Sequence, residues 1–287
     1  MLGPDRGRYP DGNSLLVRGR EETVLIDPSL GVRSRRAALD AVDWCLGSHC
    51  HEDHVAGLDR FPDRPFRLHE ADAPGMRSIE GLLAIYGFPA EVAQAFAPVL
   101  TEQFHFVPRQ DTETFQGGAT FDLGGVTIEV LHLPGHTRGH CCFLIEGAEA
   151  GPLLYLGDID LSSFGPYYGD AWSDLADFER SLERVRGVEA RWYATFHHIG
   201  VLERPDFLAR LDRFEGVIAR REERLLAFLA APRTLEAIVE HRFVYRPGDD
   251  VLFADAVERT SMRQHLERLT RSGRVEEVDP GAFRAVS

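Results

Sequence analysis

The stretch "SHCHEDH", residues 48–54, decides how the rest of this chain is interpreted. It directly follows the short apolar run "WCLG", which is typical of a buried strand. Because side chains alternate along a strand, His49 and His51 are expected to point to the same side. Asp53 and His54 start a helical pattern that turns them toward an adjacent point. The stretch therefore predicts two half-sites for metal ions, a short distance apart.

The remaining metal ligands are expected at the ends of later strands. A zinc ion takes about four nitrogen, oxygen or sulfur ligands, so the first stretch cannot complete a site alone. His136 lies in "HLPGHTRGH", Asp158 in "LYLGDID", and His197 and His198 in "TFHHIG", each just beyond an apolar run. Four strand-to-loop junctions thus supply ligands of suitable chemistry. Their convergence predicts a metal centre more specifically than any one histidine pair.

Length and charge limit the possible classes of protein. The chain has 287 residues, enough for one large α/β domain with or without a small appendage. Its net charge of −14 is unfavourable for a general nucleic-acid binder. No apolar run approaches the roughly 18–20 residues that span a bilayer, and the N-terminus has no apolar signal core. We therefore expect a cytoplasmic protein that has no membrane partner.

Hydrophobic patterning predicts a strand-rich first part and a helical second part. The expected strands are 13–19, 23–29, 44–50, 65–72, 119–125, 126–135, 141–147, 152–160 and 190–200. Residues 78–100 have helical spacing and are unusually apolar, so we interpret them as a helical insertion that forms a lid over the substrate pocket; the alternative is a helical hairpin that only packs on the core. Residues 175–187 are a further expected helix.

The pattern changes again after residue 205. A long amphipathic helix is followed by a second helix opening with Thr234 as its N-cap, a third helix, and a short β pattern. This order is typical of a winged helix, and we place the domain boundary between residues 211 and 212. Arginine and acidic residues are interleaved in 212–287, which disfavours a nucleic-acid-reading face. We interpret this part as a packing or dimerisation element that also walls the pocket.

Five motifs in order resemble the metallo-β-lactamase-fold metallo-hydrolase superfamily, which includes glyoxalase II-like hydrolases. They are Asp27 in "LIDPS", the stretch "HCHEDH", His136 in "PGHTRGH", Asp158 in "LGD", and "FHH". Residues 212–287 resemble the small winged-helix-like domain that is appended in one branch of this superfamily. The resemblance implies an α/β fold, the αββα sandwich, in which residues 1–211 form the catalytic domain with metals at one sheet edge.

The resemblance also implies a role for each site residue. His49, His51 and His136 would bind the first metal, whereas Asp53, His54 and the fifth-motif histidine would bind the second. Asp158 would bridge the two metals, together with a hydroxide. An ungapped comparison with the family motif favours His198 as the fifth-motif ligand.

Several further residues are expected to support catalysis. Asp53 would also accept a proton from the nucleophile, His140 would orient an acidic ligand, and Asp27 would be a buried hydrogen-bond acceptor. The expected substrate-binding residues are Leu83, Tyr86 and Phe88 of the lid, together with His197.

The expected function is therefore that of a dinuclear metal-dependent hydrolase. A metal-bridging hydroxide would cleave an ester, thioester, lactone or lactam bond of a small metabolite. The two ions are expected to be zinc, although iron and manganese suit the same ligands. Two alternatives remain: a nuclease or phosphodiesterase acting on RNA or DNA, and a non-catalytic metal-binding regulator. A homodimer is a further possibility.

Overall fold

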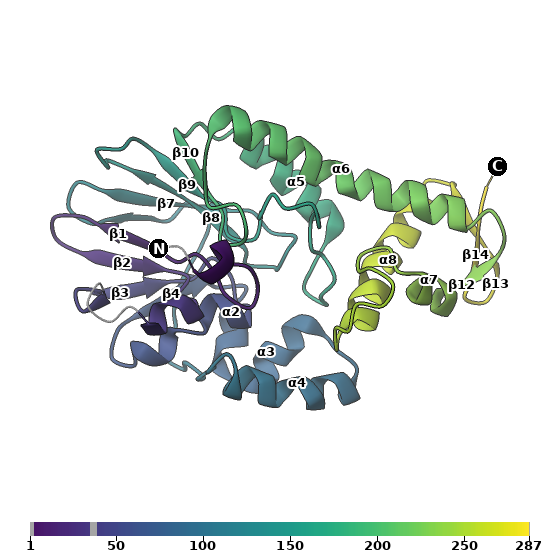
Figure 1. Cartoon of the computed structure of the whole chain (residues 1–287), viewed down its shortest axis with the longest axis horizontal. Coiled ribbons are helices and arrows are strands. Elements are labelled where there is room, and N and C mark those ends of the chain that lie inside the picture. The colour runs from purple at the N-terminus through teal and green to yellow at the C-terminus, as the bar shows by residue number, and fades with distance from the viewer. Residues whose placement is uncertain (1–2, 35–38, 287) are drawn as a thin grey trace.

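The computed structural model describes residues 3–34 and 39–286, and two β-sheets packed face to face form its centre (Figure 1). The first sheet has the order β1-β2-β3-β4-β5. β1 and β2 are antiparallel, as expected for a hairpin, and the remaining pairs are parallel. The strands of this sheet are β1 Leu15–Arg18, β2 Thr23–Ile26, β3 Trp44–Leu46, β4 Phe66–His69 and β5 Glu113–Phe115.

The second sheet has six strands in the order β11-β10-β9-β8-β7-β6. β9 and β10 are parallel, and the other neighbours are antiparallel. β7 and β9 are both antiparallel to β8, so β7, β9 and β10 run in one direction. The strands are β6 Thr120–Asp122, β7 Thr127–His132, β8 Cys141–Glu146, β9 Leu153–Tyr155, β10 Trp192–Ala194 and β11 Val201–Glu203.

Helices cover the outer face of each sheet and complete the expected αββα sandwich (Figure 1). A buried cluster between the sheets includes Ile26 and Leu46 of one and Val130 and Phe143 of the other. Outside the first sheet lie α2 Glu52–Val55, α3 Ile79–Tyr86 and α4 Ala90–Glu102; outside the second lie α5 Leu175–Arg186 and α6 Arg204–Phe228. Short 3-10 turns occur at Pro4–Arg6, Leu30–Ser34, Leu58–Arg60 and Ala73–Arg77.

The insertion expected at 78–100 is a pair of helices. The Ser78 side chain caps α3 by accepting a hydrogen bond from the backbone N–H of Gly81. Gly87 ends α3 at a positive φ of 64°, a conformation that glycine adopts without steric cost. The two helices pack on the first sheet through Leu82, Phe96 and other side chains of one buried cluster.

The C-terminal part follows the expected order of helices and hairpin. It comprises α7 Leu235–His241, α8 Ala254–Arg271, β12 Arg233–Thr234, β13 Val275–Asp279 and β14 Ala282–Ala285. Thr234 caps α7 as expected, accepting from the N–H of Ala237. α6 runs unbroken through residue 211: Leu211 packs in the core beside the second sheet, and Leu225 packs in the C-terminal core. The expected boundary therefore lies inside a helix that both parts share.

No helix in the described ranges combines the length and the apolar character that a bilayer crossing needs.

Candidate metal centre

The expected ligand residues lie at the carboxyl ends of four strands. The stretch from Ser48 to His54 follows β3, whereas His136, Asp158 and His197 follow β7, β9 and β10. Because β7, β9 and β10 run in the same direction, their carboxyl ends meet at one edge of the second sheet. β3 ends at the same edge of the facing sheet, and the four loops meet there.

Three imidazole nitrogens form a close triangle in the first group of ligands. His49 Nε2 lies 3.0 Å from His51 Nδ1 and 3.2 Å from His136 Nε2, and His51 Nδ1 lies 3.0 Å from His136 Nε2. Nitrogens bound to one tetrahedral ion at about 2.0–2.1 Å would be roughly 3.3 Å apart. The observed triangle is thus close to what a single cation requires.

The other ring nitrogen of each of these histidines is already engaged. His136 Nδ1 donates to the Tyr167 carbonyl at 3.0 Å, and His51 Nε2 lies 2.9 Å from Asp170 Oδ2. His49 Nδ1 lies 3.0 Å from the Ser48 hydroxyl oxygen, which itself donates to Asp27. The inner nitrogens therefore carry lone pairs. Three lone pairs aimed at one point are favourable only around a cation, so these residues fit a metal ion.

Burial favours the neutral form of His49. Complete burial, followed by the neighbouring imidazoles of His54 and His51, holds the pKa of His49 well below its ordinary value. A neutral imidazole keeps the lone pair that a metal ligand needs.

The second group consists of Asp53, His54 and His197. His197 Nε2 lies 3.0 Å from Asp53 Oδ2, and His54 Nε2 lies 3.9 Å from Asp53 Oδ1. The outer nitrogens are again engaged: His54 Nδ1 donates to Asp27 Oδ2 at 2.9 Å, and His197 Nδ1 donates to the Gly7 carbonyl at 2.7 Å. Buried Asp53 Oδ2 and His54 Nε2 lie at ion-pair distance from His197 and Asp158, but neither atom has a hydrogen bond of good geometry within the described residues.

Asp158 reaches both groups with different oxygens. Its Oδ2 lies 3.2 Å from His136 Nε2, and its Oδ1 lies 2.9 Å from His54 Nε2 and 3.8 Å from His197 Nε2. Although burial alone would raise the pKa of Asp158, the imidazoles of His54 and His197 hold it well below its ordinary value. The carboxylate is therefore ionised and can serve two cations at once.

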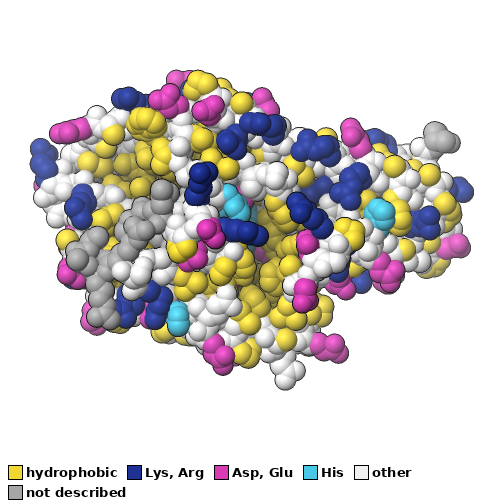
Figure 2. All heavy atoms as spheres, viewed as in Figure 1, with side chains coloured by type: hydrophobic (Ala, Val, Ile, Leu, Met, Phe, Trp, Pro, Cys, Tyr) yellow, Lys and Arg dark blue, Asp and Glu magenta, His cyan; other side chains and the backbone are white. Residues whose placement is uncertain are grey.

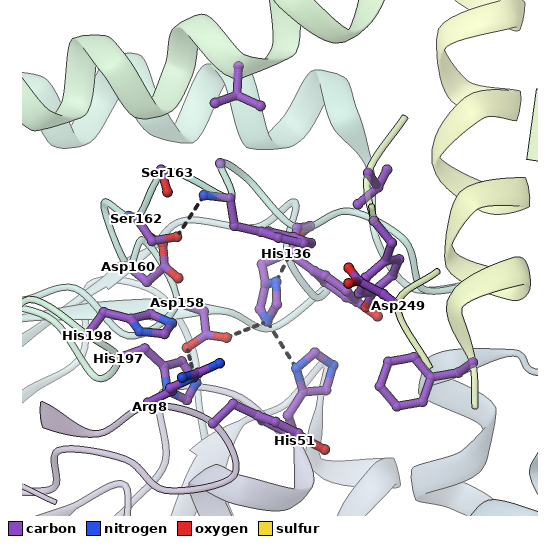
Figure 3. Close-up of a pocket in the computed structure, with 18 of the residues that line it drawn as sticks. Arg8, His51, His136, Asp158, Asp160, Ser162, Ser163, His197, His198 and Asp249 are labelled. Carbon is purple, nitrogen blue, oxygen red and sulfur yellow. Dashed lines mark hydrogen bonds and ion pairs between the residues drawn. The ribbon is translucent and has the colours of Figure 1, made fainter. Parts of the chain in front are cut away.

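The structure exchanges the expected places of His197 and His198. His197, and not His198, forms a group with Asp53 and His54. Figure 3 shows both histidine side chains near Asp158. His198 has a positive φ of 60°, so the backbone turns immediately after His197. Its ring lies beside the group, where it lines the pocket. The geometry therefore favours His197, and not the expected His198, as the potential ligand of this group.

Asp27 and His140 position the potential ligand residues through hydrogen bonds. Asp27 accepts hydrogen bonds from the Ser48 backbone and hydroxyl, both at 2.6 Å, and from Tyr155 at 2.9 Å, as expected of a buried acceptor. His140 Nδ1 donates to the Leu133 carbonyl, and its Nε2 accepts from the Asp158 backbone N–H at 3.1 Å. His140 thus fixes Asp158 through the backbone, not through its carboxylate. Burial lowers the pKa of His140 to about 3, consistent with this accepting role.

Sequence reasoning missed two aspartates that hold the centre together. Asp170 lies behind His51, and its Oδ1 accepts from the Tyr167 hydroxyl at 2.9 Å. Asp72 accepts from the backbone of Cys50 and Gly139, joining the loops that carry the second and third motifs. Asp72 lies in "LHEADAP", which the sequence comparison could have singled out. Asp170 is in a loop with no strand-end pattern to reveal it.

We expect that replacing Asp170 with alanine lowers kcat/KM about 10- to 100-fold. The change removes the acceptor that fixes the tautomer and orientation of His51, and partners behind a ligand typically have effects of this size. Steady-state kinetics together with metal titration would measure the loss. An Asp170→Asn variant should recover much of the activity, since its amide oxygen can still accept from His51. Equal losses in both variants would contradict a positioning role.

A large pocket opens over both groups of ligands. It has a volume of about 1100 Å³, and Tyr86, Phe88 and His197 line it as expected. Leu83 does not line this pocket; it is partly buried and packs against the hydrophobic cluster that includes Leu82. Tyr86 stacks on His51 with ring centroids 5.3 Å apart, and its hydroxyl donates to Glu52. Glu52 also accepts from Tyr9 at 2.9 Å, so it anchors the aromatic side of the pocket.

Comparison with known proteins identifies a matching family and several similar proteins. Residues 8–198 match the family model described as the metallo-beta-lactamase superfamily. The acyl-coenzyme A thioesterase MBLAC2 of Homo sapiens is 30% identical over 202 residues, covering 62% of this chain and 69% of that protein. An atrochrysone carboxyl ACP thioesterase of Pseudocercospora fijiensis is 30% identical over 242 residues, covering 80% of this chain and 60% of that protein. A metallo-beta-lactamase family protein of Thermus thermophilus has a similar structure, with a TM-score of 0.70, 26% identity, and coverage of 100% of this chain and 96% of that chain.

Proposed function

We propose that this chain, which belongs to the metallo-beta-lactamase superfamily and is a metallo-hydrolase, hydrolyses the thioester bond of an acyl group carried by a small thiol. The observation that carries the proposal is the combination of two adjoining ligand groups with a pocket that has an aromatic wall. The relatives in Homo sapiens and Pseudocercospora fijiensis are both named thioesterases, which favours a thioester among the bonds considered.

The ligand groups would hold two divalent ions, with zinc the expected metal. His49, His51 and His136 would hold one ion, and Asp53, His54 and His197 the other, with Asp158 shared. When bound, the ions would acidify a shared water and polarise the thioester carbonyl. Sharing one carboxylate also reduces the repulsion between two neighbouring cations.

The chain's own residues would position the substrate and move the proton. The Asp53 carboxylate lines the pocket at the ligand groups, where it can accept a proton from the attacking water. Water oxygen would add to the carbonyl carbon, the carbon–sulfur bond would break, and the thiolate would leave and be protonated. The acyl group would lie against the aromatic side chains of Phe88, Phe96 and Phe253, which line the same pocket. Phe88 and Phe253 stack with centroids 5.4 Å apart, so the C-terminal part helps to build this wall.

Metal analysis and a substrate panel would test the proposal. We expect close to two divalent ions per chain, at least about 100-fold preference for acyl thioesters over nitrophenyl phosphodiesters and single-stranded RNA, and loss of activity after chelation. Adding a divalent metal back should restore turnover. Preferential cleavage of RNA would instead support a nuclease. Two bound ions without turnover on any substrate would support a non-catalytic regulator, and full activity in metal-free protein would contradict the entire scheme.

A further inference from the structure

One face of α6 borders the pocket along much of its length. Arg210, Val217, Arg220, Arg221 and Arg224 all line the pocket. Their separations of seven, three or four, and three or four residues place them on one side of a helix. Fourteen residues of α-helix extend about 21 Å, at about 1.5 Å per residue. The pocket thus has an elongated wall in which arginine predominates.

Two of these arginines are structural. Arg221 is buried and donates to the carbonyls of Pro166 and Phe164 at 2.7 and 2.9 Å. Arg224 donates to the carbonyls of Phe243 and Arg242 at 3.1 and 2.9 Å. These bonds attach α6 to the loops on either side. The exposed Arg220 guanidinium instead donates within its own helix, to the Arg213 carbonyl at 3.2 Å, so it does not join α6 to a loop through that bond.

None of the six arginines that line the pocket forms an ion pair within the described residues; apart from Arg221 and Arg224, they are Arg8, Arg210, Arg220 and Arg246. Arg220 and Arg246 are exposed, and Arg210 is half-buried. The chain as a whole has a net charge of −14. Guanidinium groups without an ion-pair partner that gather in one pocket therefore favour the binding of an anionic ligand there.

Three acidic residues of α6 pair with side chains of neighbouring helices. Asp212 and Glu215 pair with Arg186 of α5 at 2.6 and 2.7 Å. Glu222 contacts Arg268 of α8, and His265 lies 3.2 Å from it. These pairs tie α6 to its neighbours, and none of the three carboxylates lines the pocket. Figure 2 shows arginine side chains along the rim of a hollow that contains histidine, with hydrophobic atoms on its other side.

We propose that Arg210, Arg220 and Arg246 bind the phosphate groups of coenzyme A, the thiol carrier of the substrate. This inference rests on the proposed thioesterase function. The guanidinium fork matches phosphate oxygens in two-point hydrogen bonds. Coenzyme A carries its phosphates at the end opposite its sulfur, so an elongated arginine wall can hold that end while the thioester reaches the metal ligands. The acyl group then lies against Phe88 and Phe253, on the other side of the pocket.

The geometry favours the free coenzyme over a carrier protein that bears the same phosphopantetheine arm. Arg210 and Arg220 are ten residues apart, about 15 Å along the helix. The arm of a carrier protein has a single phosphodiester, whereas coenzyme A has a pyrophosphate and a separate phosphate. The pocket volume of about 1100 Å³ also exceeds the roughly 300–1,000 Å³ typical of small-ligand sites, as a bulky nucleotide requires.

A double Arg210→Gln, Arg220→Gln variant tests the proposal with two substrates that carry the same acyl group. We expect KM for the acyl-coenzyme A to rise at least about 10-fold, with kcat within about twofold. For the corresponding acyl-pantetheine, which has no phosphate, kcat/KM should stay within about twofold of the unaltered protein. Arg213→Gln is the matched control, because Arg213 is on α6, is exposed and does not line the pocket. It should behave like the unaltered protein.

Inhibition by free coenzyme A, compared with pantetheine, provides an independent readout. Coenzyme A should inhibit more strongly, and the double variant should lose that difference. Equal losses on both thioesters, or no loss on either, would overturn the phosphate-binding role and leave the proposed function intact. Hydrolysis of a carrier-protein thioester at least 10-fold faster than the coenzyme A thioester would overturn the choice of carrier. Absence of hydrolysis on every thioester would instead refute the proposed function.

Discussion

An Asp158→Ala variant is expected to lose at least about 1,000-fold in kcat on any substrate that the unaltered protein hydrolyses. Asp158 reaches both ligand groups, its Oδ2 lying 3.2 Å from His136 and its Oδ1 2.9 Å from His54. Removing it takes away a negative charge between two cation sites and a ligand of each. The expected loss corresponds to about 4 kcal/mol of transition-state stabilisation, within the several kcal/mol that metal centres supply.

Elemental analysis should show that this variant binds about one metal ion per chain or fewer. Asp160→Asn is the matched control, because Asp160 is two residues away, lines the same pocket and belongs to neither ligand group. Its Oδ1 accepts from the Ser162 backbone, a bond that the asparagine oxygen can retain. Two bound ions and near-normal turnover in Asp158→Ala would contradict the shared-ligand assignment.

Replacing His197 with alanine is expected to lower kcat/KM about 100-fold and to remove about one metal ion per chain. His197 Nε2 faces Asp53 and Asp158, and its other nitrogen is fixed by the Gly7 carbonyl, so the lone pair has a defined direction. The adjacent His198→Ala variant should stay within about threefold of the unaltered protein, since His198 lines the pocket outside both groups.

The two variants differ by one position in the chain and thus control for each other. Metal content and kcat/KM should be measured together, because a ligand role predicts a loss in both. A larger loss of metal from His198→Ala than from His197→Ala would restore the assignment expected from the motif alignment.

Local sequence patterns were sufficient to predict those helices, strands and turns whose own residues carry a hydrophobic period or a capping residue. The hairpin of β1 and β2, the insertion helices α3 and α4, and the cap at Thr234 all follow from nearby residues. β5 and β11 were not predicted, because each has two exposed side chains among its three residues and neither lies within a longer apolar run. Without such a run there is no hydrophobic period from which a strand can be predicted.

The choice between His197 and His198 shows where such patterns fail. Both follow β10, and both are chemically able to bind a metal. The left-handed turn at His198 and the carbonyl of distant Gly7 decide which ring faces Asp53. Neither feature is encoded in the motif itself.

By itself the sequence determined the types of the potential ligands and their places at strand ends, because these are local properties of the chain. Only the tertiary structure decided that His197 groups with Asp53 and His54, that Asp170 lies beside His51, and that arginines of α6 line the same pocket. The physical reason is distance along the chain: Gly7 and His197 are 190 positions apart, and their contact exists only after the two sheets and the last helices have packed.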